Sequence, residues 1–376
     1  MRATMQVIVA ACRRALGNDP GDDIAALVSS VTDWSGFVRC VDAHAVAPIV
    51  YAPLAQTGRV PGETLAQLRA AMDENALRSI VLARTLREIV DLLEQNDVAV
   101  IPIKGPLLAR SAYGDLASRR FADLDLVVHR RDLDRARALL AQRGFGPAIP
   151  LPRQAEAAVL GADYHVALVE PEQNVMVELH WALVRSGLAG LNDHAWPWTH
   201  CGETTALGIP MRTLTTDATF MYLCVHGSKH RWSQLGWLCD LAALARTSSA
   251  SWPEVERLAA SVGAIRMAML GCALAADLLG APLRGWPGQR DAHVARLASD
   301  VRSRLFDDAP TMSLSTFELR VRTRLADRIA YLAQIATGPR VPDVRLAALP
   351  HSARALYYVL RPARLAAKYG RRALGR

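Results

Sequence analysis

The spacing of hydrophobic residues divides this chain into three parts. From residue 1 to about residue 97, apolar side chains recur every three or four positions, for example across Ile24–Val31 and Leu77–Leu93. This spacing places them on one face of a helix, so the pattern predicts a helical N-terminal region over residues 1–97. Asn96-Asp97 then forms a turn signal at the end of the region.

After residue 97 the apolar residues form short runs. Val98–Ile103 and Leu124–Val128 are typical of β-strands, with a helix beginning near Pro106 between them. The segments DYHVALV (163–169) and VMVELHW (175–181) predict two more strands joined by a five-residue hairpin loop. Residues 98–214 are therefore predicted to form an α/β core, although residues 183–212 show no regular pattern.

Helical spacing returns at Thr215 and continues through the rest of the chain. The sequence thus predicts an α/β (α+β) fold, in which a small central sheet is flanked by a helical region at 1–97 and another at 215–376. With 376 residues, the chain is long enough for two or three domains.

Two carboxylates stand close together in the second predicted strand. Asp123 and Asp125 are two residues apart, so their side chains point to the same face of the strand. Neighbouring carboxylates repel unless a cation lies between them, and a hard divalent ion such as Mg²⁺ prefers oxygen ligands. The pair predicts a metal-dependent site for phosphoryl or nucleotidyl transfer. A charged strand edge without a metal is the alternative interpretation.

Composition narrows the class of protein. Hydrophobic residues make up 51% of the chain and charged residues 21%, as in folded globular proteins. No apolar run reaches the roughly 18 residues that a membrane span needs, and Arg13 and Arg14 interrupt the short apolar stretch at the N-terminus, which predicts a helix rather than a signal peptide. Six scattered cysteines form no CxxC pair, which argues against a zinc site and a disulfide framework and favours a cytoplasmic location.

The net charge is +8, and arginine carries nearly all of the positive charge because the chain has only three lysines. A basic surface attracts anionic substrates such as a nucleotide or RNA. A solvated arginine surface explains the same charge equally well. The chain shows no RNA-binding module and no basic platform with interleaved aromatic residues, so RNA is the less favoured partner.

Five separated motifs share their order with a known family. They are Lys104-Gly105 with Tyr113 downstream, Arg120-x-x-Asp123-Leu124-Asp125-Leu126-Val127-Val128, Val177-Glu178-Leu179-His180-Trp181, His226-Gly227-x-x-His230, and Trp237-Leu238-x-Asp240-Leu241. Over residues 30 to 280 the chain resembles the bacterial uncharacterised nucleotidyltransferase family, which belongs to the polymerase-β-like nucleotidyltransferase superfamily. The resemblance implies a minimal nucleotidyltransferase mixed sheet.

The resemblance also implies a catalytic site. Asp123 and Asp125 would hold Mg²⁺ or Mn²⁺, and Glu178 on a later strand would complete the metal site and help to activate the attacking hydroxyl. Gly105 and Lys104 would meet the phosphates of an NTP, with ATP as the expected nucleotide. One departure stands out, because the superfamily usually has Gly-Ser at this turn and the chain has Gly105-Pro106.

Each of the other candidate site residues has two possible roles. Arg120 either binds phosphate or pairs with Asp123 or Asp125. His180 is either a ligand or substrate contact, or a buried side chain bonded to the backbone. His226, Lys229 and His230 lie on one helical face, where they either contact the substrate or tie the helical region to the catalytic unit.

Together these residues predict a Mg²⁺-dependent enzyme that moves an NMP group from an NTP to an unidentified small-molecule, peptide or protein acceptor and releases pyrophosphate. Two alternatives stay open. One is a kinase-like transfer of a phosphate group on the same site. The other is a catalytically silent module that binds a nucleotide or peptide.

Overall fold

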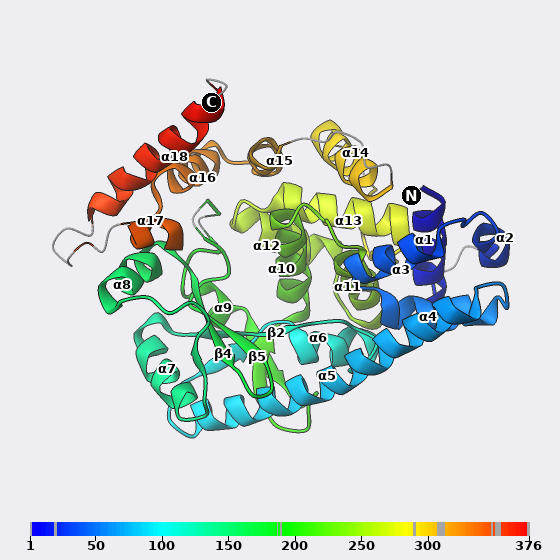
Figure 1. Ribbon diagram of the computed structural model, residues 1–376, viewed down its shortest axis with the longest axis horizontal. Helices are drawn as coiled ribbons and strands as arrows, with labels where there is room; N and C mark the ends of the chain where they lie inside the picture. Colours follow the sequence, from blue (N-terminus) through cyan, green and yellow to red (C-terminus); the bar gives the residue numbers. More distant parts are fainter. Residues whose placement is uncertain are drawn as a thin grey trace.

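A computed structural model gives the fold of the chain (Figure 1). It describes residues 2–18, 21–185, 187–188, 190–288, 291–306, 313–346, 349 and 355–373. The mixed α/β architecture that the sequence predicts is confirmed, with a five-stranded mixed sheet among helices.

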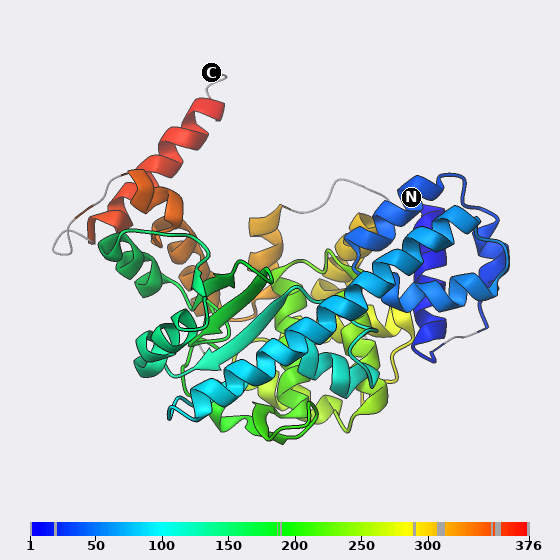
Figure 2. The same ribbon diagram turned by 60° about the horizontal axis from the view of Figure 1, so that its bottom comes forward.

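The N-terminal region is helical, as its periodicity predicts. Its helices are α1 (Arg2–Ala15), α2 (Ile24–Val28), α3 (Trp34–Ala43), α4 (Ala47–Gln56) and α5 (Gly62–Glu94). Asp23 and Asp33 accept hydrogen bonds from backbone N–H groups in the first turns of α2 and α3, which satisfies donors that a helix start leaves unpaired. The 33-residue helix α5 runs from the other N-terminal helices to the sheet (Figures 1 and 2).

The central sheet has the strand order β1-β2-β5-β4-β3. Its strands are β1 (Val100–Pro102), β2 (Asp123–Val128), β3 (Gly146–Pro147), β4 (His165–Glu170) and β5 (Val175–His180). β2 and β5 are parallel, and every other neighbouring pair is antiparallel. The four strands expected from the sequence are therefore present, each within a few residues of its predicted bounds, and β4 and β5 form the predicted hairpin.

Short helices connect and cover the strands. They are α6 (Gly105–Leu108), which continues as a π-helical turn at Ala109–Tyr113, a 3₁₀ turn at Arg130–Asp132, α7 (Leu133–Ala141), α8 (Arg153–Ala162) and α9 (Trp196–Thr199). The expectation that residues 183–212 are irregular is wrong in part, because β6 (Cys201–Thr204) and β7 (Met211–Leu214) form a second, two-stranded sheet. Four-residue strands are too short to show a clear alternation in the sequence.

The rest of the described chain is helical. Its helices are α10 (Thr216–Lys229), α11 (Leu235–Thr247), α12 (Trp252–Ser261), α13 (Ile265–Leu279), α14 (Ala292–Phe306), α15 (Leu314–Val321), α16 (Leu325–Thr337), α17 (Val341–Leu346) and α18 (Tyr357–Ala373). Figure 2 shows α18 projecting away from the body of the molecule. Among the described residues, no helix combines the length and apolar character that crossing a membrane requires.

Two large hydrophobic clusters hold the molecule together. One lies under the sheet and includes Leu126, Val177 and Leu86 of α5. The other joins buried side chains of α1, α3 and α4 to those of α10, α11 and α13. Since this second core combines residues from both ends of the sequence, the division at residues 97 and 214 stays a prediction about sequence regions.

Candidate active site

The parallel pairing of β2 with β5 brings the predicted carboxylates together. Asp125 lies directly across from Glu178, and Asp123 lies across from Met176. Because side chains two residues apart share a face, Asp123, Asp125 and Glu178 all point to one side of the sheet. These residues line a single cavity of about 730 Å³.

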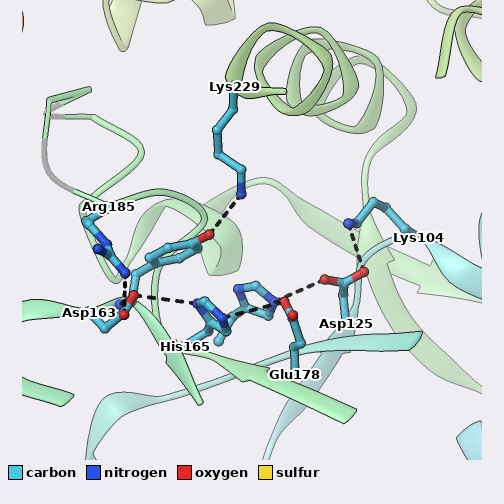
Figure 3. Close-up of polar contacts among 9 residues, drawn as sticks. Lys104, Asp125, Asp163, His165, Glu178, Arg185 and Lys229 are labelled. Atoms are coloured by element: carbon cyan, nitrogen blue, oxygen red, sulfur yellow. Dashed lines mark hydrogen bonds and ion pairs between the residues drawn. The ribbon is translucent and has the colours of Figure 1, made fainter. Parts of the chain in front are cut away.

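A lysine side chain lies beside the aspartate pair and neutralises part of its negative charge. Nζ of Lys104 lies 2.9 Å from Oδ2 of Asp125, and both side chains are largely buried (Figure 3). Lys104 lies in the turn between β1 and α6, where the sequence predicts contacts with phosphates. Its ammonium group also neutralises the carboxylate of Asp125. Burial opposes the charged form of Lys104, but the charges of Asp125 and Asp123 outweigh it and raise its pKa.

His180 bonds to side chains rather than to the backbone. Its Nε2 lies 3.1 Å from Oδ1 of Asp125 and 3.3 Å from Oε2 of Glu178. The predicted alternative of a histidine bonded to the backbone is therefore wrong, since the backbone near His180 is occupied by the pairing of β5 with β2 and β4. With only 2% of its surface exposed, His180 fixes the positions of two of the three carboxylates.

The two aspartates differ in their electrostatic surroundings. Burial raises the pKa of Asp123, and the charge of Asp125 raises it further. Burial would also raise the pKa of Asp125, but Lys104 and the hydrogen bond from His180 hold it well below its ordinary value. Asp125 is therefore ionised and paired with Lys104 and His180, whereas at Asp123 the charges of Lys104 and Arg119 do not offset burial and the charge of Asp125.

The turn at Lys104-Gly105 has the backbone that the sequence suggests. Gly105 has a φ of +48°, a left-handed conformation that favours glycine, and α6 begins there. Pro106 follows in the first turn, where it offers neither a hydroxyl nor a backbone N–H to a phosphate. Lys104 and Gly105 line the cavity beside the carboxylates.

The consecutive residues Arg119 and Arg120 have different environments. Arg120 is exposed and pairs with Asp42 of α3, so the predicted pairing with Asp123 or Asp125 is wrong. Arg119 is buried and makes two hydrogen bonds to Asp240 of α11, at 2.8 and 3.0 Å. Tyr113 donates to the same carboxylate at 2.8 Å. Both arginines line the cavity.

The end of α10 lines the cavity with His226 and Lys229, and His230 follows directly after the helix. Nζ of Lys229 donates a hydrogen bond of 2.8 Å to the hydroxyl of Tyr164, which precedes β4 (Figure 3). This bond joins the C-terminal helices to the sheet. Lys229 therefore makes the structural tie that was one of its two predicted roles, while also facing the cavity.

The residues present fit a divalent cation. Asp123, Asp125 and Glu178 offer the hard oxygen donors that Mg²⁺ prefers, and they share one wall of the cavity. Among the described residues, one group has ligand atoms that all lie within 4.8 Å of one another, and it consists of His165, Glu178 and His180. Glu178 belongs to both sets, which makes it the shared ligand position of the site.

Several cavity residues were not among the predicted candidates. His165 lies across from His180 on β4, Tyr222 belongs to α10, and Trp237 belongs to α11. Arg119 directly precedes Arg120, the arginine that the sequence indicates as a phosphate ligand. One sequence signal was available for His165, because it lies in a predicted strand on the same face as the apolar residues Ala167 and Val169. The positions of Arg119 and Trp237 follow from the packing of α11 against the turn at Tyr113.

The mixed sheet carries three carboxylates on one face, beside a glycine turn and two lysines. The model of the family described as "Uncharacterised nucleotidyltransferase" matches residues 30–280. Because this match covers more than half of the chain, the protein belongs to the uncharacterised nucleotidyltransferase family. The predicted family and enzyme class are thereby confirmed, and transfer of a nucleotidyl group is its general activity.

Comparison with solved structures gives two distant likenesses. The chain is 15% identical to the antibiotic-resistance factor ANT(2'')-Ia in its solution structure, over 49% of this chain and 91% of that chain, with a TM-score of 0.36. The crystal structure of ANT(2")-Ia in complex with adenylyl-2"-tobramycin gives 15% identity over 48% of this chain and 95% of that chain, with a TM-score of 0.32. No curated protein matches the chain.

Proposed function

We propose that the protein transfers an NMP group from an NTP, with ATP as the expected nucleotide, to a small-molecule, peptide or protein acceptor and releases pyrophosphate. One observation carries the proposal. Asp125 and Glu178 are direct partners on adjacent parallel strands, and Asp123, Lys104 and Gly105 line the same cavity. This placement matches the roles that the family resemblance implies for each residue.

The three carboxylates would hold Mg²⁺ or Mn²⁺. The bound cation would supply charge neutralisation for the triphosphate. Lys104 keeps Asp125 ionised before loading, so a carboxylate is ready to bind. His180 keeps the carboxylates of Asp125 and Glu178 oriented toward each other. Glu178 lies at the half-exposed end of this array, where an acceptor hydroxyl can approach it.

Positive charge from this chain also favours a polyanionic substrate. Arg119 is held rigidly by Asp240, and its Nη1 has no hydrogen-bond partner among the described residues. Lys229 adds a second cationic group to the cavity. Arg119 and Lys229 would attract the phosphates by their positive charge. They would act in place of the serine hydroxyl that Gly105-Pro106 lacks.

The test is transfer from labelled ATP in the presence of Mg²⁺ and pooled acceptors. The proposal predicts that label from the α-phosphate appears on an acceptor while label from the γ-phosphate appears in pyrophosphate. Label from the γ-phosphate on an acceptor, with ADP as the by-product, would instead show a kinase-like reaction. No turnover of any NTP with any acceptor class would favour a silent binding module.

The catalytic carboxylates are tested by Asp123→Asn and Asp125→Asn. Removing a preorganised charge from a reaction centre lowers turnover by roughly 10²- to 10³-fold, and we expect at least this loss for each variant. Asp134→Asn is the matched control, because Asp134 is an exposed aspartate on α7 outside the cavity. Unchanged Mg²⁺-dependent turnover in the two site variants would refute the assignment.

A further inference from the structure

The cavity has a second wall, which is made of aromatic rings. His226 of α10, His230 directly after α10 and Trp237 of α11 line it from the helical side. The ring centroids of Trp237 lie 5.5 Å from His226 and 5.2 Å from His230, and the two imidazoles are 4.7 Å apart. We call these three residues the ring wall.

The ring wall is electrically neutral although it lies beside two lysines. Burial, followed by the charge of Lys104, holds the pKa of His226 well below its ordinary value. Burial and the charge of Lys229 lower the pKa of His230 to about 4. Uncharged imidazoles beside an indole present flat π-faces, which suit stacking against another ring system.

The ring wall also has free space next to it. A recess of about 30 Å³ adjoins Trp237 and is bordered by Gln234, Gly236 and Ala45. Trp237 and Gln234 line both the recess and the main cavity. Trp237 is only partly buried, although it packs against the larger hydrophobic core, and it lines the main cavity with its exposed part.

The two walls differ in the chemistry that they can bind. The sheet side carries Asp123, Asp125 and Glu178 with Lys104, and these groups suit a metal-bound polyanion. The ring wall carries no net charge and suits a planar aromatic group. An NTP joins both kinds of group in one molecule.

We propose that the ring wall is the nucleobase subsite, in which the base of the NTP stacks on Trp237 while the triphosphate faces Lys104 and the carboxylates. This inference rests on the proposed function. Stacking of a base on an aromatic side chain strengthens binding by about 10- to 100-fold when compared with alanine at that position. It requires no particular base, so several NTPs are expected to bind with similar affinity.

The experiment compares two ligands that share the phosphates and differ in the base. Dissociation constants for ATP and for inorganic tripolyphosphate, both with Mg²⁺, are measured by calorimetry on the full chain. Trp237→Ala should weaken ATP binding by about 10- to 100-fold and leave tripolyphosphate binding unchanged. Trp237→Phe should restore most of the ATP affinity, because it restores a stacking face.

Two further variants separate an effect on base stacking from a general loss of stability. Trp286→Ala is the matched control, because Trp286 is also half buried but packs against Trp252 away from the cavity. His230→Ala removes an imidazole that is partly exposed at the edge of the ring wall, and it should weaken ATP binding several-fold without affecting tripolyphosphate binding.

Three outcomes would overturn the inference. Unchanged ATP binding in Trp237→Ala would assign the ring wall to the acceptor or to packing. An equal loss for ATP and tripolyphosphate would show that the variant disturbs the phosphate site. If the unaltered protein binds neither ligand, the proposed function fails together with the inference, and this result differs from the first two because it appears before any residue is changed.

Discussion

The two walls of the cavity differ in their side chains, because one carries charged groups and the other carries aromatic rings. The sheet wall is built from opposite charges in contact, with Lys104, Asp125, His180 and Glu178 linked in sequence by distances of 2.9 to 3.3 Å. The ring wall consists of His226, His230 and Trp237, whose rings lie edge-on or tilted to one another. The sheet wall is largely buried, whereas the ring wall is exposed at His230, and only the sheet wall holds closely paired charge.

The difference shows how burial acts on different groups. On the sheet, burial penalises each charge, but the neighbours compensate, so Asp125 stays ionised. On α10 the charge of Asp125 opposes burial only weakly, while the charges of Lys104 and Lys229 lower the pKa of His226 further, so His226 stays neutral. The Arg119–Asp240 pair connects the two walls, because Arg119 precedes β2 and Asp240 belongs to the same helix as Trp237.

The largest expected effect concerns this connection. Arg119→Met leaves the buried carboxylate of Asp240 with Tyr113 as its hydrogen-bond partner among the described residues, so the free energy of unfolding should fall by about 3–5 kcal/mol. Arg120→Met is the control, because it removes only an exposed pair with Asp42 and should cost about 0–1 kcal/mol. Chemical denaturation measures both. Equal losses in the two variants would show that the connection between the walls contributes no special stability.

The second effect concerns the charge balance of the sheet wall. Lys104→Met removes the cation next to Asp125 but leaves the hydrogen bond from His180, so we expect a smaller loss of about 2–4 kcal/mol in the presence of EDTA. Mg²⁺ should restore part of this loss, because a cation held by Asp123, Asp125 and Glu178 takes over the neutralising role.

The comparison for this variant is the unaltered protein under the same two conditions. Saturating Mg²⁺ should stabilise Lys104→Met more than it stabilises the unaltered chain. If Mg²⁺ gives equal stabilisation to both proteins, the lysine and the cation do not act on the same carboxylates.

The smallest effect concerns the neutral state of the ring wall. The pKa of His226 is lower in the folded protein than the ordinary value of 6.5. Between that value and the folded-state pKa the unfolded chain binds more protons, so the stability that this histidine contributes is present above pH 6.5 and is lost as the pH falls. His226→Gln should therefore flatten the decline in the free energy of unfolding between pH 7 and pH 5. Parallel curves for the two proteins would contradict a buried, neutral His226.

Much of the fold follows from local pattern. The helical spacing before residue 97 and the apolar runs around Leu124–Val128 and 175–181 indicate which segments become helices and strands, because each segment must hide its own apolar face. The two-residue spacing of Asp123 and Asp125 likewise fixes their common side of the strand. Two of the three lysines in an arginine-rich chain, Lys104 and Lys229, line the cavity, which is a signal that composition alone contained.

Strand pairing and helix docking are not local, and they decide the partners of each side chain. Asp125 meets Glu178 because β2 and β5 pair in parallel with a particular register, and a shift of one residue would turn Glu178 to the other face. Arg119 and Arg120 are adjacent in sequence and of the same type, yet the docking of α11 buries one against Asp240 and leaves the other at the surface with Asp42.

The sequence by itself determined most of the helices and strands of this protein, its family and the common face of Asp123 and Asp125. Only the tertiary structure decided that Lys104 neutralises Asp125, that His180 bonds to carboxylates, and that a neutral ring wall faces them. The physical reason is the distance in sequence over which each kind of interaction acts. Backbone geometry sets periodicity over a few residues, whereas burial and charge pairing depend on segments that are distant in sequence and meet only after folding.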